Sequence, residues 1–304
     1  MNKSPAHLMR ASRPQNMRLL YKLFMYDIRV GFDSNKVLFL LAAVVFITLF
    51  LIFYSDCNTP YVIDENGEFY SLSSEKESAV DYLLFFFKGI KIYDLSSQRP
   101  FEIPILWLAI QISLALLVTA YPLRDLYSYA PQNIVRSQRK WIWWLAKCLW
   151  VILTVFAFYG ICLLAALIGG IVGGGGVFGP NSAIQLYINN LDLAGVTGIE
   201  LLLLMLVPVF VSVALSLVQV TLSLIIKPVF SFLVLMSYHL ISTIVYSPFI
   251  IADYPMLLRN VLFEPDGLSS EAMILVSLCI AVIAIATGAL IFKRTDIYPK
   301  NELH

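Results

Sequence analysis

The chain has 304 residues, of which 59% are hydrophobic and 13% charged, and its mean hydropathy is +0.80. Soluble domains are about 25% charged, so this composition excludes an ordinary water-soluble enzyme and indicates a membrane protein. The formal net charge of +1 excludes a binder of nucleic acid or another polyanion.

Six segments are apolar and long enough to cross the hydrocarbon as helices, which takes about 20 residues. They are residues 37–54, 103–122, 141–169, 199–226, 228–250 and 271–292. No Lys or Arg lies between Lys147 and Lys227, or between Arg259 and Lys293. The alternating pattern of membrane barrels is lacking, so we predict an all-α membrane protein with one transmembrane domain over 1–304.

The basic residues predict the orientation of these spans. With both termini in the cytoplasm, 16 of the 21 Lys and Arg residues lie on the inner side. An excess of basic residues in inner loops is the rule for multi-pass proteins. We therefore predict a plasma (cytoplasmic) membrane protein with both ends inside.

The first predicted element is a basic amphipathic helix over residues 17–29, directly before the first span. Arg18, Lys22 and Arg29 fall on one face, and apolar residues such as Phe24 recur at helical spacing on another. Such a helix suits the cytoplasmic interface of the membrane. Two interpretations stay open: a lipid anchor, or a lever that also touches a partner protein.

The longest exterior loop, residues 55–102, is acidic, with nine Asp and Glu residues against four cations. Its stretch 83–90, Leu-Leu-Phe-Phe-Phe-Lys-Gly-Ile, is too short to span, and we expect it to dip into the outer interface. A solvated loop is the favoured interpretation, ahead of a small folded cap or a substrate vestibule.

The inner loop 123–140 is too long for a tight hairpin, and we predict a short helix around 124–137. Aromatic and basic residues follow it at the start of the third span: Trp141, Trp143, Trp144 and Lys147. Trp and Lys at the end of a span are typical interface anchors, so we assign these residues that role.

Three later segments have distinctive composition. The glycine-rich run 169–176 lacks the Lys of a phosphate-binding loop, and it predicts either a flexible exterior linker or close packing through Gly169 and Gly173. Lys227-Pro228 leaves almost no loop, so we predict a tight inner hairpin. The apolar exterior segment 251–270 predicts a re-entrant pair of short helices.

The residues of a membrane enzyme are missing. The three His residues do not form a zinc helix, no G-x-S-x-G sequence is present, and the four Cys residues contain no CxxC. We therefore predict neither a catalytic nor a metal site.

Polar residues inside spans are candidates for function. We predict that some of them line a substrate path: Gln111, Gln219, Ser237, His239 and Ser242. For His239, a hydrogen bond between packed helices is the favoured role over a proton relay. Acidic groups near mid-membrane, which coupled transporters usually need, are lacking.

In their order along the chain, these parts resemble the permease subunit of a type-2 ABC exporter. The segment Asn133-Ile134-Val135-Arg136-Ser137, followed by Trp141-Ile142-Trp143-Trp144-Leu145-Ala146-Lys147, is similar to the family's entry into its third span. The segment Phe292-Lys293-Arg294-Thr295-Asp296-Ile297 is similar to its frequent ending. The resemblance covers the whole chain, and the long acidic loop departs from it, which leaves the substrate open.

The resemblance implies a non-catalytic permease that works as a dimer, meeting through spans one and five. ATP and Mg²⁺ would bind to a separate cytoplasmic ATPase, and this chain would hold no cofactor. The chain resembles permeases of Gram-positive bacteria that export amphipathic peptides or confer immunity to them. An ion-coupled secondary transporter or channel is the alternative.

Since the chain has no nucleotide motif, energy from a partner ATPase must enter through a cytoplasmic surface. The inner loop sits between two spans, so we predict that it couples to the ATPase; the alternative is that its cations only follow the positive-inside rule and contact lipid head groups. The predicted coupling residues are Arg124, Asp125, Tyr127, Tyr129, Arg136, Arg139 and Lys140.

Overall fold

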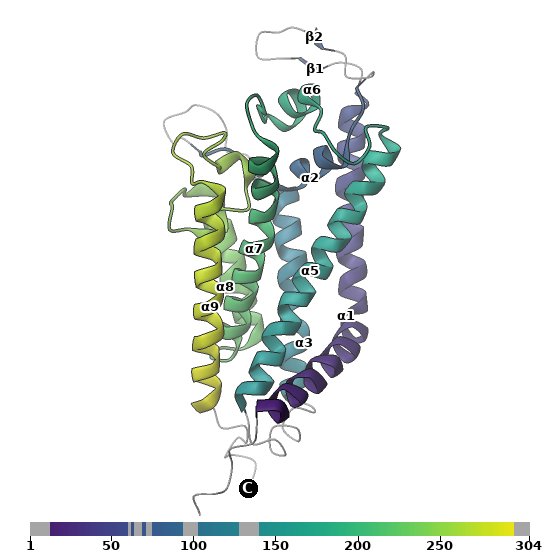
Figure 1. Cartoon of the computed structure of the whole chain (residues 1–304). Coiled ribbons are helices and arrows are strands. Elements are labelled where there is room, and N and C mark those ends of the chain that lie inside the picture. The colour runs from purple at the N-terminus through teal and green to yellow at the C-terminus, as the bar shows by residue number, and fades with distance from the viewer. Residues whose placement is uncertain are drawn as a thin grey trace, which may run out of the picture.

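The protein is a bundle of long helices lying side by side (Figure 1). The computed structural model describes residues 13–59, 62–63, 69–70, 75–93, 103–127 and 140–294. The long helices are α1 (Arg13–Cys57), α3 (Ile105–Tyr127), α5 (Lys140–Val172), α7 (Gly198–Ser223), α8 (Pro228–Ile244) and α9 (Ser270–Arg294). The most extensive contacts join α7 to α9 and α1 to α5.

Each of these helices covers one predicted span. Four of them, α1, α5, α7 and α9, are long and apolar enough to cross a membrane. Within the residues whose side chains the structure describes, the other two helices give shorter apolar stretches, Ile105–Thr119 in α3 and Pro228–Ile244 in α8. The predicted class, a helical multi-pass membrane protein, is therefore confirmed with four candidate spans.

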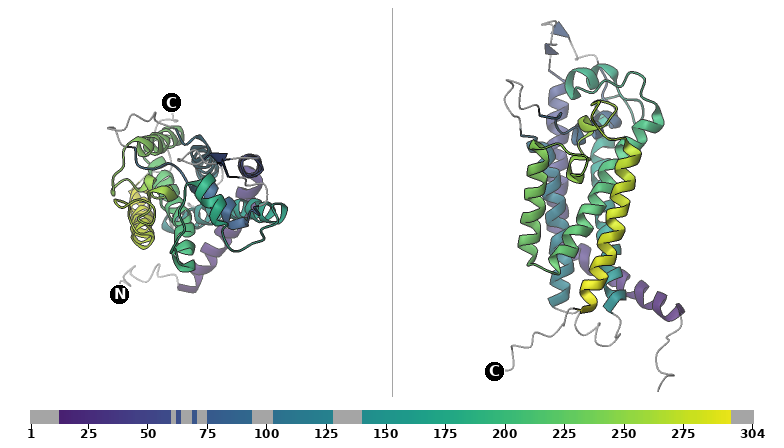
Figure 2. Two further views of the ribbon diagram at one scale, coloured as in Figure 1. Left: turned by 90° about the horizontal axis from the view of Figure 1, so that it is seen from above. Right: turned by 90° about the vertical axis from the view of Figure 1, so that its left-hand side faces the viewer.

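The predicted interface helix and the first span form one continuous helix, α1. Its N-terminal part turns away from the bundle (Figures 1 and 2). Gly31 lies in the stretch that joins them, and a Cβ there would stand 2.3 Å from Nε1 of Trp150 on α5. The small residue lets α1 pass close to that ring without a break in the helix.

Short elements cover one end of the bundle, which we name the capped end (Figure 1). They are β1 (Val62–Ile63), β2 (Phe69–Tyr70), α2 (Ala79–Phe87), α6 (Ser182–Ile184), the π-helical turn η1 (Gln185–Asn189) and the 3-10 turns η2 (Ile251–Asp253) and η3 (Leu257–Arg259). The two strands pair antiparallel, Val62 with Tyr70 and Ile63 with Phe69. The first residue of α5 and the last of α9 lie at the opposite end.

Residues 75–93 are packed into the protein, so the interpretation of a solvated loop is wrong for this stretch. Ser78 and Asp81 form a capping box at the start of α2. Asp81 is fully buried and accepts hydrogen bonds from the Asn181 backbone N–H at 2.9 Å and from Nε2 of Gln185 at 2.6 Å. The aromatic end of α2 is buried in the main core rather than in a membrane interface. Of the three interpretations, a small folded cap is the one that fits.

The glycine run 169–176 is a close-packed joint, so the flexible-linker interpretation is wrong. The Ala79 backbone N–H donates to the Gly176 carbonyl at 2.9 Å, and the Gly175 N–H donates to the Glu77 carbonyl at 3.0 Å. Backbone meets backbone here because there is no Cβ to separate them. The run therefore fixes the entry into α2 against the end of α5.

Gly170→Ala is expected to destabilise the protein by about 1–3 kcal/mol through overpacking. A Cβ at this position would stand 2.3 Å from the Gly176 carbonyl oxygen and 2.4 Å from the Ala79 nitrogen, both backbone atoms. Gly160→Ala is the matched control on the same helix, because its Cβ would meet nothing within 4 Å. That variant should be neutral or more stable, by up to about 1 kcal/mol. Thermal unfolding in detergent measures both, and equal midpoints would contradict the packing argument.

In the two remaining connections, the hairpin and the pair of short helical turns follow their predictions, and the re-entrant position of the pair in a membrane stays a prediction. Helix α7 ends at Ser223 and α8 begins at Pro228, which is the predicted tight hairpin. The segment 251–270 folds into the two short turns η2 and η3, whose residues are buried. The fifth predicted span was too long, since α8 ends at Ile244 and not at 250.

Candidate functional site

A buried ion pair joins the N-terminal part of α1 to α5. Nζ of Lys147 lies 2.5 Å from Oδ1 of Asp27, and both side chains are almost fully buried. The same ammonium lies over the ring of Trp143, 5.2 Å from its centroid. Further along α1, Nδ2 of Asn35 donates to the Leu117 carbonyl of α3 at 3.0 Å. The basic segment of α1 is therefore fixed to two other helices.

The predicted interface residues lie on the outside of this fixed segment. Arg18, Lys22 and Arg29 are exposed, and Phe24 is half-buried. The apolar side chains of Met17 and Tyr21 are exposed beside them. The surface thus combines cations with apolar groups, as a helix at a membrane interface does.

The structure describes the side chain of only one of the seven predicted coupling residues. Arg124, Asp125 and Tyr127 belong to the last turns of α3, where the helix is described but its side chains are not. Tyr129, Arg136 and Arg139 lie outside the described residues, with most of the predicted helix 124–137. Lys140 is the first residue of α5.

The anchor role is wrong for three of the four residues assigned to it. Trp143, Trp144 and Lys147 are buried within the protein, and Trp141 is exposed. Trp143 stacks on Phe292 with ring centroids 4.8 Å apart, and Nε1 of Trp144 donates to the Ile285 carbonyl at 2.9 Å. These rings hold α5 against α9.

The residues predicted to line a path do not share one surface. Gln111, Gln219, His239 and Ser242 are buried within the single chain, whereas Ser237 is exposed. Nε2 of Gln219 donates to the Ala115 carbonyl at 3.2 Å and to the hydroxyl of Thr119. Gln219 thus ties α7 to α3, which is a packing role.

A polar seam between α3 and α8 contains Gln111 and His239. The ring of His239 packs edge-on against Trp107 with centroids 5.4 Å apart, and Gln111 follows Trp107 by one turn of α3. Three buried nitrogens here make no hydrogen bond within the described structure: Nε1 of Trp107, Nε2 of Gln111 and Nδ1 of His239. The favoured role for His239, a hydrogen bond between helices, is therefore not the one that the structure gives it.

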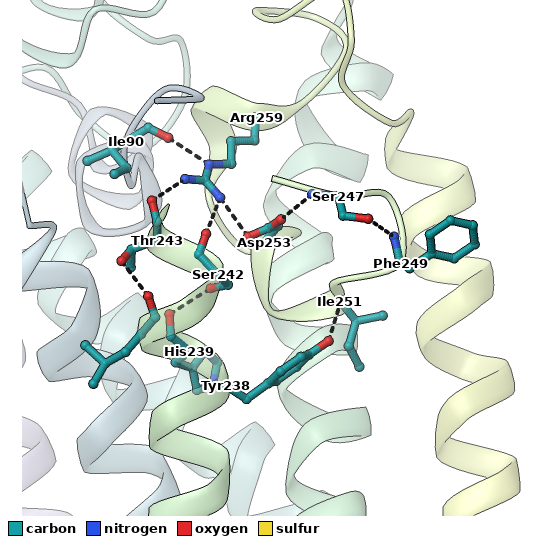
Figure 3. A network of polar contacts seen from close by, with 11 residues as sticks. Ile90, Tyr238, His239, Ser242, Thr243, Ser247, Phe249, Ile251, Asp253 and Arg259 are labelled. Atoms are coloured by element: carbon teal, nitrogen blue, oxygen red, sulfur yellow. Dashed lines mark hydrogen bonds and ion pairs between the residues drawn. The ribbon is translucent and has the colours of Figure 1, made fainter. Parts of the chain in front are cut away.

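At the capped end, Arg259 links three segments (Figure 3). Its guanidinium donates to the carbonyls of Ser242 and Thr243 at the end of α8, to the Ile90 carbonyl beyond α2, and to Oδ1 of Asp253 at 2.7 Å. The last carbonyls of a helix lack partners within it, so Arg259 caps α8.

Arg259 and Asp253 are both buried. Burial raises the pKa of Asp253, and the adjacent guanidinium opposes that shift. Loss of water likewise lowers the pKa of Arg259, against the pull of the carboxylate.

Two buried acids were missed from the sequence, although signals were present. Asp27 lies almost opposite the three cations of the predicted helix 17–29 at 100° per residue. That side of the helix must face protein or lipid. Asp253 and Arg259 stand six residues apart in an otherwise apolar segment. A buried charge needs a partner, so each pair could have been proposed.

Within the described residues, no group of three or more His, Cys, Asp or Glu side chains is placed to hold a metal ion. Comparisons with family models, with curated proteins and with solved structures give no match for this chain.

Proposed function

We propose that this chain is the permease subunit of an ATP-driven exporter, moved by a separate cytoplasmic ATPase. The observation that supports it is the buried Asp27–Lys147 pair, which joins a surface-exposed basic helical segment to the bundle. A force on that segment would be transmitted directly to α5, because a buried, hydrogen-bonded ion pair resists separation. Of the two interpretations of this segment, the lever is the one proposed.

In this proposal all six long helices cross the membrane, with both termini in the cytoplasm and the capped end outside. Two copies form the path, meeting through α1 and α8. The substrate is an amphipathic peptide, for which the acidic exterior loop offers electrostatic attraction. Arg124, Asp125 and the inner loop that follows them contact the ATPase.

Purification of the tagged chain from its native membrane tests the proposal. An ATPase should co-purify, and its activity should fall when Arg124 and Asp125 are both replaced with alanine, while membrane insertion is unchanged. Lys293→Ala is the matched control, since it removes an exposed cation at the same end of the bundle. Transport by the pure chain without nucleotide would refute the proposal.

The orientation can be tested with a membrane-impermeant thiol reagent on intact cells. Cys57 is buried and should not react while the protein is folded. Phe178→Cys should react from outside, because Phe178 is 87% exposed at the capped end. Lys36→Cys, exposed directly before the predicted first span 37–54, should react only after the membrane is opened. The reverse pattern would invert the topology.

An ion-coupled transporter is the second candidate, and the polar seam is the observation that favours it. Three unpartnered buried nitrogens could serve a small polar ligand. Transport assays in vesicles distinguish the two functions. A coupled transporter works with an ion gradient alone, and His239→Phe should then abolish transport. An ATP-driven permease should need nucleotide.

A further inference from the structure

A large apolar groove separates α5 from α7 near the capped end. Its volume is about 740 Å³, within the range of ligand pockets. Residues 159–167 of α5 and 198–209 of α7 form its sides, residues 79–87 of α2 and Leu257 close it inside, and residues 177–180 line it at the capped end. Tyr159 donates to the Pro208 carbonyl at 2.8 Å and marks the other end.

The groove opens toward the surface that faces hydrocarbon. Leu163 and Leu202 line it and are exposed, on two of the four helices that are apolar enough to cross a membrane. Apart from the hydroxyl of Tyr159, which is already bonded within the protein, the side chains that line it are apolar. Water gains no partners in such a place.

The length of the groove matches one leaflet. The twelve residues from Gly198 to Val209 rise about 16 Å along the helix axis, at 1.5 Å from each residue to the next. The hydrocarbon core is about 30 Å thick, so one leaflet contributes about 15 Å. An empty groove would lack dispersion contacts along its walls. A hydrocarbon chain from the membrane beside the mouth would restore these contacts by entering the groove.

We propose that this groove binds one acyl chain of a membrane phospholipid, whose end reaches the buried helix α2. The inner wall distinguishes it from ordinary lipid contact on a helix surface, since α2 belongs to the capped end and is joined to α5 by the glycine run. The site depends on α5 and α7 lying in the bilayer and not on ATP-driven transport, so the two proposals can fail separately.

Photo-crosslinking of the full chain tests it. The protein is reconstituted in phosphatidylcholine vesicles in which the acyl chains bear a diazirine, and adducts are mapped by mass spectrometry. In the native sequence, adducts should concentrate on residues 159–167, 198–209 and 79–87 relative to the exposed apolar face of α9. An even distribution over the exposed apolar surfaces would overturn the proposal, without any variant being needed.

Two variants of α7 sharpen the test. Leu202→Trp fills the mouth of the groove and should reduce adducts on α2 about tenfold, a change of ~1.4 kcal/mol in binding. Ile199→Trp is the matched control, because Ile199 is 72% exposed on the same helix, against 58% for Leu202, and does not line the groove. Equal labelling of the two variants would contradict the proposal. Displacement of the lipid by an equimolar amphipathic peptide would also overturn it, by assigning the groove to the substrate.

Discussion

Arg259→Ala is expected to lower the free energy of unfolding by about 3–5 kcal/mol, because it removes the cation beside a buried carboxylate. Asp253 would keep its burial and lose the guanidinium at 2.7 Å. The carbonyls of Ser242 and Thr243 would also lose their donors. The free energy of unfolding of Arg259→Lys should lie between those of the native protein and Arg259→Ala. An ammonium keeps the charge, but it lacks the planar guanidinium that donates to several acceptors at once.

Thermal or denaturant unfolding in detergent measures these losses. Lys36→Ala is the matched control, because its pair with Asp33 spans 3.6 Å with side chains 74% and 79% exposed. Exposed pairs contribute about 0–1 kcal/mol. An Arg259→Ala protein as stable as the control would show that the network is not a stabilising one.

Lys147→Met should cost a similar amount, about 3–5 kcal/mol, since it removes the cation that pairs with buried Asp27. The loss should appear first in the N-terminal part of α1. Arg18, Lys22 and Arg29 are exposed there, so faster trypsin cleavage at these three sites reports release of the segment from α5. A second substitution, Asp27→Leu in the Lys147→Met protein, should recover most of the stability, because apolar replacement of a whole buried pair is often neutral.

The control for this pair is Lys293→Met, which removes an exposed cation at the end of α9. Its rate of trypsin cleavage at Arg18, Lys22 and Arg29 and its unfolding midpoint should equal those of the native protein. If Lys147→Met behaves in the same way, Asp27 and Lys147 do not hold α1 to α5, and the observation behind the proposed lever is lost.

The helices could be predicted from the sequence because hydropathy is a local property. Each predicted span lies on an observed helix, and the hairpin at Lys227-Pro228 followed from its two residues. The predicted ends of the spans were wrong where apolar residues continue beyond the helix, as after Ile244. The predicted interface helix and the first span were separated by seven residues, so it was not predicted from the sequence that α1 is one continuous helix.

The site was predicted less well, because contacts between distant segments leave little trace in a single sequence. Nothing near Asp81 in the chain indicates its partners Asn181 and Gln185. One error was avoidable: Ser237 and His239 are two residues apart, hence about 200° apart on a helix, and could not both face one lumen. Ser237 is exposed and His239 buried, as that angle requires.

The capped end also constrains how the protein is made. Ile90 precedes Arg259 by 169 positions, which at about 5–20 residues per second is roughly 10–30 s of synthesis. Asn181 arrives earlier, 100 positions after Asp81. Newly made α2 therefore waits for its later neighbours, first for α5 and the glycine run 169–176, then for residues 181–189 and last for η3. Until η3 arrives, the Ile90 carbonyl and the last carbonyls of α8 lack their donor Arg259, so this interval is when a nascent chain would need protection by a chaperone or would be open to proteolysis.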